Sequence, residues 1–207
     1  ATCDPAGRGV QVAIFFLVGH GTSASALAWA LYMAARFPGW QDRVAEEALR
    51  EIDPEHPDFS AVKRLTTARD VFRETLRLYP PVPMMVRETT CPERFRGRKV
   101  AKGAQIVLSP WHQHRHERLW KRPDEFDPSR FATGNGKAGL RTAYMPFSAG
   151  PRVCTGAGFA MVEGPLILAM ILRAFRVDLV EDRPAMPVAH LTVRGKDGIW
   201  LRITPRG

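Results

Sequence analysis

Cysteine is scarce in this chain. Cys3, Cys91 and Cys154 include no Cys-x-x-Cys pair and form no even-numbered set. A disulfide framework is thereby excluded, and free thiols are typical of a reducing compartment. A signal peptide pattern is also missing, because cationic residues are sparse at the start and no cleavage site follows a short apolar core. We therefore expect a cytoplasmic protein.

Long basic runs are missing as well. The chain has 30 Lys and Arg residues against 21 Asp and Glu, a formal net charge of +9, yet aromatic residues do not interleave with the basic ones. Nucleic-acid-binding surfaces concentrate basic charge and add aromatic side chains for stacking. We expect no nucleic-acid partner and favour an acidic protein partner for this charge.

A third absence lies in the segment Gly9–Ala35, which contains no Asp, Glu, Lys or Arg. A run of this length and composition is typical of a transmembrane helix. Polar and helix-weak residues interrupt it from Gly19 to Ser23, however, and polar groups are costly in lipid. We therefore expect no membrane span in this chain. Val10–Ala35 is interpreted as a long buried helix that crosses the centre of a soluble core.

The remaining pattern predicts a mainly helical fold with small β-sheets. The further segments with helical apolar periodicity are 41–52, 60–78 and 158–175. The segments typical of strands are 82–88 and 105–109, followed near the end by a hairpin of 191–193 and 199–201. Residues 121–150 are expected to be largely irregular.

Cys154 has the most informative surroundings. Residues 147–156 read Phe-Ser-Ala-Gly-Pro-Arg-Val-Cys-Thr-Gly, and a long apolar run follows. Glycines free the backbone to point N–H groups at sulfur, Arg152 supplies a nearby cation, and apolar walls exclude water. A thiolate bound to a metal needs all of these, whereas a packing cysteine needs none.

The loop pattern Phe-x-x-Gly-x-Arg-x-Cys-x-Gly resembles the haem-binding loop of the cytochrome P450 family, the haem-thiolate monooxygenases. The residues that fill its fixed positions are Phe147, Gly150, Arg152, Cys154 and Gly156. The resemblance implies haem b with Cys154 as the axial thiolate ligand of the iron. It further implies that Phe147 tunes the thiolate by packing, and that Gly150 and Gly156 let the backbone approach it.

A charged motif supports the same resemblance. Glu74 and Arg77 match the family's Glu-x-x-Arg motif, and Arg130, within residues 123–131, matches the third partner of that pair. The i, i+3 spacing places Glu74 and Arg77 on one helix face. Alone they would be a surface ion pair. The resemblance implies instead a buried structural network beneath the cysteine loop.

The polar stretch Gly19–Ser23 resembles the family's oxygen-binding kink, in which a glycine lets a helix open over the iron. Gly19 matches this glycine, and Thr22 matches the catalytic threonine that manages protons on the distal side. Gly21 stands where the family usually has an acidic residue, so the usual proton-relay partner is missing. The alternative is a Gly-Thr-Ser stretch that merely packs closely against another helix.

The resemblance also assigns contacts around the haem. Arg87 and Arg152 are expected to bind its propionates, because the planar guanidinium fork suits carboxylates. Pro81–Val86 and Ala189–Thr192 are expected to border the substrate pocket.

The resemblance covers the whole chain but only about the second half of the family's fold. We therefore expect residues 1–207 to be the C-terminal, haem-binding half of a single domain, either as a fragment or as a natural truncation. The implied reaction inserts one oxygen atom from O2 into a small organic substrate, with electrons from an acidic ferredoxin, flavodoxin or reductase. Two alternatives stay open: a peroxide-using or isomerising haem-thiolate enzyme, and a haem-binding or scaffold protein without turnover.

Two other patterns are set aside. Residues 134–139 fit Gly-x-Gly-x-x-Gly but follow no strand and open no strongly apolar helix, so we expect a flexible loop rather than a dinucleotide site. His112, His114 and His116 alternate as ligands of a strand-borne metal would. The resemblance makes them part of an irregular surface segment, and we expect no metal there.

Overall fold

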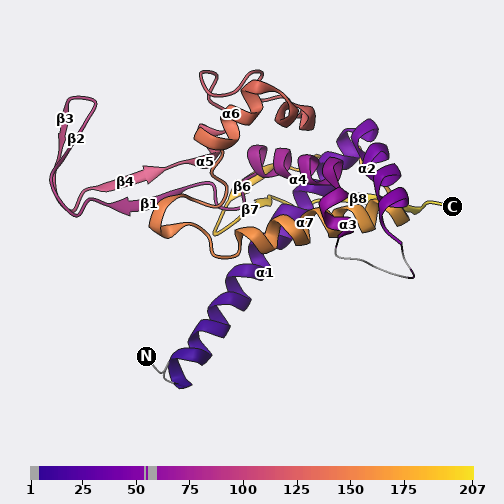
Figure 1. The fold of residues 1–207 in the computed structure, drawn as a ribbon, viewed down its shortest axis with the longest axis horizontal. Coiled ribbons are helices and arrows are strands. Elements are labelled where there is room, and N and C mark those ends of the chain that lie inside the picture. Colours follow the sequence, from indigo (N-terminus) through magenta and orange to yellow (C-terminus); the bar gives the residue numbers. More distant parts are fainter. Residues whose placement is uncertain (1–4, 54, 56–59) are drawn as a thin grey trace.

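The computed structural model describes residues 5–53, 55 and 60–207. The chain is mainly helical with small β-sheets, as the sequence predicts (Figure 1). Its helices are α1 (Pro5–Arg36), α2 (Pro38–Glu51), α3 (Ala61–Arg64), α4 (Thr66–Leu78), α5 (Pro110–Gln113), α6 (Gly134–Thr142) and α7 (Ala157–Ala174), with 3-10 turns η1 (Pro128–Ala132) and η2 (Gly150–Arg152).

The strands pair two by two, each pair antiparallel. The pairs are β1 (Met85–Glu88) with β4 (Gln105–Leu108), β2 (Glu93–Phe95) with β3 (Arg98–Val100), β5 (Phe175–Leu179) with β8 (Leu201–Pro205), and β6 (Pro187–Ala189) with β7 (Val193–Gly195). In Figure 1 the β1–β4 pair and the β2–β3 hairpin extend away from the helices. The first pair joins the two strand segments that the sequence predicts.

The core lies where α2, α4 and α7 pack on the C-terminal half of α1. Trp29 of α1 is completely buried there, and its indole stacks on Tyr79 with ring centroids 4.1 Å apart. The indole N–H also donates to the carbonyl of Val193, at 3.1 Å, so its polar atom is satisfied. This side chain therefore joins α1 both to the end of α4 and to β7.

A buried amide fixes α2 against its neighbours. The Gln41 side chain donates to the carbonyls of Ala34 and Val177, at 3.1 and 2.8 Å, and its oxygen accepts from the Val177 N–H at 2.8 Å. A fully buried amide is tolerated because these hydrogen bonds replace those lost to water. Gln41 thus ties α1, α2 and β5 together.

The first half of α1 differs from the prediction. The predicted helix exists, but it is buried only from about Ser25 onward, and its earlier apolar side chains are 46–73% exposed. These are Val10, Val12, Ile14, Phe15, Phe16, Leu17 and Val18. The reason is visible in Figure 1, where this half projects from the body while the described core elements pack on the other half. The expectation of one long buried helix is therefore wrong for residues 10–18.

Two described helices are long and apolar enough to cross a membrane, by length and composition alone. They are Gly9–Arg36, with 17% of its apolar window buried, and Ala157–Ala174, with 28% buried. Soluble core helices also meet this criterion, and α7 packs against α2 and α4.

The Gly-x-Gly-x-x-Gly stretch is a helix, not the flexible loop expected. Thr133 caps α6 by accepting a hydrogen bond from the Gly136 N–H, at 3.1 Å. A Cβ at Gly139 would lie 2.8 Å from the Trp120 ring, and one at Gly136 would overlap the Arg130 carbonyl. The glycines therefore serve close packing of α6 against η1 and Trp120.

The predicted C-terminal hairpin is wrong in its pairing. Residues 193–195 form β7 and pair with β6, whereas residues 201–205 form β8 and pair with β5, which directly follows α7. Strands β7 and β8 each pair with an earlier strand and not with each other. The turn glycine Gly198, at φ +87°, therefore lies between two separate sheets.

Candidate functional site

The cysteine loop, residues 147–156, is closed by its own backbone. The N–H of Cys154 donates to the carbonyl of Phe147 at 2.8 Å, and η2 lies between them. Gly150 has φ +70°, a left-handed conformation that glycine adopts without a steric penalty. Ser148 has φ +65°, which is uncommon for a residue with a side chain. The loop is thus a compact turn that presents Cys154 just before α7.

The Cys154 thiol is free and exposed. The residue lies three positions before the first residue of α7. A Cβ added at Gly156 would lie 3.8 Å from the sulfur, an ordinary contact distance. The local chemistry is that of an accessible metal ligand.

The three charged residues expected beneath the loop come together. Glu74 and Arg77 are fully buried in α4, and Arg130 of η1 is 5% exposed. The Arg77 Nε and Arg130 Nε donate to the Glu74 carboxylate at 2.8 and 2.7 Å. A buried charge cluster of this kind persists only if its other polar atoms are also satisfied.

Backbone carbonyls accept hydrogen bonds from the remaining N–H groups of the two arginines. The guanidinium of Arg77 donates to carbonyls of residues 114, 123 and 125, and that of Arg130 to carbonyls of residues 121, 122 and 125. Two cations therefore share one carboxylate, and the excess positive charge is solvated by carbonyl dipoles instead of water. All of these carbonyls except that of residue 114 belong to residues 121–150, which the sequence analysis expects to be largely irregular.

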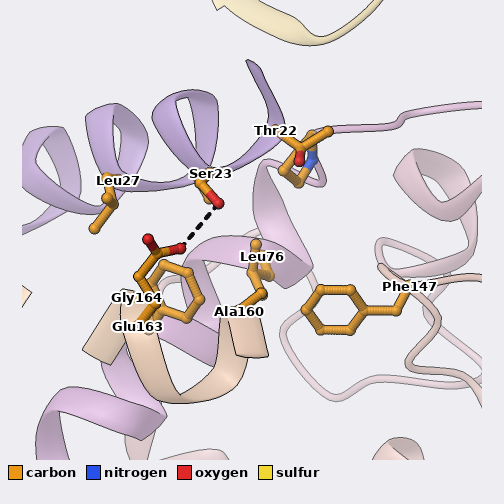
Figure 2. Close-up of a pocket in the computed structure, with 11 residues that line it drawn as sticks. Thr22, Ser23, Leu27, Leu76, Phe147, Ala160, Glu163 and Gly164 are labelled. Carbon is orange, nitrogen blue, oxygen red and sulfur yellow. Dashed lines mark hydrogen bonds between the residues drawn. The ribbon is translucent and has the colours of Figure 1, made fainter. Parts of the chain in front are cut away.

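A pocket lies between α1, α4 and α7, and Phe147 is the residue of the cysteine loop that lines it (Figure 2). Thr22 and Ser23 of α1, Phe147 of the loop, and Ala160 and Glu163 of α7 are among its lining residues. Thr22 and Phe147, which are 125 residues apart in sequence, thus line one cavity. The pocket brings Thr22 and Phe147, both expected at the site, to the same cavity.

The predicted opening of α1 at the polar stretch is not observed, because α1 is helical throughout residues 19–23. The Thr22 hydroxyl donates to the Val18 carbonyl at 2.8 Å, one turn earlier, which satisfies the hydroxyl within the helix. Gly19 and Gly21 have open space where a Cβ would be added. The helix at this point is therefore closed and hydrogen-bonded, with room for side chains.

Glu163 is a pocket residue that the sequence analysis missed. Its carboxylate accepts a hydrogen bond from the Ser23 hydroxyl at 3.2 Å (Figure 2). The available signal was that α7 contains a single acidic residue among apolar ones. A lone acid in an apolar helix needs a polar partner, and here the partner is on α1.

The two arginines expected to hold carboxylates lie near the loop. Arg87 is half-buried on β1, and its Nη2 donates to the Ser148 hydroxyl at 2.8 Å. Arg152 is exposed in η2 and makes no hydrogen bond or ion pair with another residue in the described part of the chain. The guanidinium of Arg152 is thus available to an anionic group.

The segments expected to border a substrate are also neighbours. Pro81 lines the same pocket as Thr22, and its carbonyl accepts from the Val193 N–H at 3.0 Å. Pro83, Met84 and Ala189 line a second cavity beside it.

The alternating histidines do not converge. His112 bonds the Ser109 hydroxyl at 2.8 Å, and His116 accepts from the Arg118 N–H at 3.1 Å. Over residues 5–53, 55 and 60–207, no group of three or more His, Cys, Asp or Glu side chains is arranged to hold a metal. His114 is fully buried, so the expectation of a surface position is wrong for it.

Residues 9–200 match the family model of cytochrome P450. Human cytochrome P450 4F2 is 36% identical over 198 residues, which are 92% of this chain and 37% of the relative. Cytochrome P450 4c3 of Drosophila melanogaster is 34% identical over 202 residues, 95% of this chain and 37% of the relative. The solved heme domain of cytochrome P450DA has a TM-score of 0.88 at 31% identity, over 95% of this chain and 44% of that one. A mutant of that domain gives a TM-score of 0.91 at 30% identity, over 99% and 47%. This chain spans less than half the length of each of these relatives.

Proposed function

The chain belongs to the cytochrome P450 family, and we propose that it is the haem-binding half of a monooxygenase that inserts one oxygen atom from O2 into an organic substrate. Membership of the family implies haem with a cysteine thiolate ligand. The observation that carries the proposal is the free Cys154 thiol in a closed loop just before α7, a loop whose Phe147 lines the same pocket as Thr22.

The residues around the loop fit haem. A metal ligand must be free and accessible, and the Cys154 thiol is both. Arg87 is bonded to Ser148 of the loop, Arg152 lies within the loop, and both suit the propionate carboxylates. Thr22 and Phe147 face the pocket from the helix side and the loop side. Cys154 would therefore hold the iron, and the two arginines would hold the propionates.

Haem bound through a thiolate supplies O–O cleavage and transfer of oxygen to a C–H bond. The chain's own residues shape the surroundings of that chemistry. Phe147 packs against the core beside the loop and excludes water from its apolar side. The buried cluster of Glu74, Arg77 and Arg130 holds the backbone beneath the loop in one position. In this proposal the Thr22 hydroxyl turns from the Val18 carbonyl toward the pocket to pass a proton.

A peroxide-using enzyme is the second candidate, and Gly21 favours it. A proton relay next to Thr22 needs a titratable side chain, and glycine has none. The acid that lines the pocket is Glu163, on α7 and bonded to Ser23. Peroxide already carries the two electrons and the protons that O2 would have to receive. Product formation driven by peroxide without an electron donor would select this candidate.

The electron donor proposed for the O2 reaction is an acidic ferredoxin, flavodoxin or reductase. The net charge of +9 supports it, because opposite charges accelerate association. The cytoplasmic location expected from the free cysteines stays a prediction.

The ligand assignment is tested by the carbon monoxide difference spectrum of the reduced, haem-loaded protein. Cys154→Ala should abolish the thiolate-type Soret band. Cys91→Ala is the matched control, because Cys91 is also free and exposed but lies outside the loop. A thiolate-type band that survives Cys154→Ala, or that is lost in the Cys91 variant, would refute the assignment.

A further inference from the structure

His114 uses both ring nitrogens deep inside the protein. Its side chain is fully buried, Nδ1 lies 3.0 Å from the carbonyl oxygen of Arg77, and Nε2 lies 2.9 Å from the backbone nitrogen of Met145. A carbonyl oxygen can only accept and an N–H can only donate, so Nδ1 carries the proton and Nε2 is the acceptor. The hydrogen bonds thus define one neutral tautomer.

One end of this ring is anchored to the buried charge network. The Arg77 guanidinium donates to the His114 carbonyl at 2.7 Å, while the His114 ring donates to the Arg77 carbonyl. The two residues therefore bond each other twice, side chain to backbone in both directions. Such a reciprocal pair holds the ring in one orientation relative to α4.

The other end of the ring holds the segment that leads into the cysteine loop. Met145 is two residues before Phe147, whose carbonyl accepts the hydrogen bond from Cys154. The Tyr144 ring stacks on His114 with centroids 5.5 Å apart, and its hydroxyl donates to the Arg73 carbonyl at 3.1 Å. Tyr144 is thus attached to α4 directly and Met145 through His114, two residues before the loop starts.

We propose that His114 is the positioning residue of the cysteine loop: it fastens Met145 to the Glu74–Arg77–Arg130 network and thereby sets where Cys154 lies. The hydrogen-bonded path runs from Glu74 through Arg77, His114 and Met145, then along two residues of backbone to Phe147 and across to Cys154. The part of the proposal that concerns the thiolate rests on the proposed function, and the attachment of Met145 does not.

Burial keeps the His114 ring neutral, the form that can accept the hydrogen bond from Met145. Desolvation lowers the pKa of His114 from 6.5 to about 4, so the ring is neutral near pH 7. An imidazolium would have a proton on Nε2 and could not accept from Met145. The imidazole ring donates on one side and accepts on the other. An Asn or Gln side chain in its place can reproduce only one of these two hydrogen bonds.

That difference provides matched variants. In His114→Gln the side-chain oxygen can take the place of Nε2 and accept from Met145. In His114→Asn the shorter amide can donate to the Arg77 carbonyl but cannot reach Met145. The two variants are both neutral amides, so they separate the bond to the loop from the general effect of removing an imidazole.

The first measurement is amide hydrogen exchange of the chain without haem. We expect the Met145 amide to be protected in the wild type and in His114→Gln, and to exchange about tenfold faster in His114→Asn, as loss of one hydrogen bond implies. The Val177 amide, which donates to Gln41, is the internal control for an intact fold. Equal Met145 exchange in the wild type and His114→Asn, with Val177 protected in both, would overturn the attachment. If His114→Asn also loses Val177 protection, His114→Gln decides: Met145 protection there supports the proposal, and its loss with Val177 still protected overturns it.

The second measurement is the reduced carbon monoxide spectrum at equal haem content. We expect the share of thiolate-type Soret band to fall in His114→Asn and to match the wild type in His114→Gln. An unchanged share in His114→Asn, despite faster Met145 exchange, would overturn the effect on Cys154. If the wild type itself lacks the thiolate-type band, the proposed function fails, and the exchange measurement still decides the role of His114.

Discussion

Acid should destabilise this fold through His114. Its folded pKa is lowered from 6.5 to about 4 because burial disfavours the charged ring, and Arg77 and Arg115 add repulsion. Between these two values the unfolded chain binds a proton that the folded chain does not. The stability contributed by a neutral His114 is therefore fully present above pH 6.5 and is lost as the pH falls through about 4.

The size of this effect follows from the difference between the two pKa values. At about 1.4 kcal/mol per pH unit, the interval from 6.5 to about 4 corresponds to about 3 kcal/mol. This is a large part of the roughly 5–15 kcal/mol that is typical of a whole domain. The side chain has no exposed surface, so solvent does not screen the charge and reduce this effect.

Urea unfolding at a series of pH values from about 7 to 4 measures this loss. His114→Gln is the comparison, because it keeps the acceptor for Met145 but cannot titrate. Acidic groups that titrate in the same range are present in both proteins and cancel in the difference. The wild type should lose about 3 kcal/mol more than the variant over this range. Parallel pH profiles for the two proteins would show that His114 is not held neutral by burial.

Three further predictions follow from other contacts. The Glu47 carboxylate accepts hydrogen bonds from the backbone N–H groups of Thr67 and Ala68 at the start of α4, at 2.8 and 2.9 Å. Glu47→Ala should therefore lower the free energy of unfolding by about 1–2 kcal/mol. The control Glu46→Ala, at an exposed position, should change it little. A Cβ at Gly164 would overlap the Phe72 ring, so Gly164→Ala should cost about 1–3 kcal/mol, whereas Gly158→Ala, which has open space in the same helix, should not; chemical denaturation of both variants checks this. Gly21 also has open space, so in a protein that contains the rest of the family's fold Gly21→Asp should raise the product formed per electron supplied; a flat ratio with haem binding intact would show that the missing acid is not limiting.

The elements that sequence patterns predicted well are those with strong periodicity or a fixed spacing. The segment from Gly158 to Phe175 is a helix within one residue at each end, because its apolar run is continuous. Glu74, Arg77 and Arg130 lie together as the motif implies. The cysteine loop was recognisable because its glycines and its cysteine have a fixed spacing.

Features that depend on what packs against a segment could not be predicted in this way. An uncharged helix carries no hydropathy contrast, so the sequence does not distinguish the buried half of α1 from the half that is exposed. The glycines at 136 and 139 look like a flexible loop, but contacts with Arg130 and Trp120 make them part of a helix. His114 lies in a polar stretch, and its burial follows from partners at residues 77 and 145.

The carbonyls that surround Arg77 and Arg130 have a consequence for local unfolding. Residues 114–125 contain little regular structure, which is ordinarily a sign of low protection against opening. Here any opening would strip the carbonyls from two buried cations and leave their charge unsolvated. The segment and helix α4 should therefore open as a single cooperative unit, at a free energy close to that of global unfolding. In its energetics this irregular stretch behaves as part of the core.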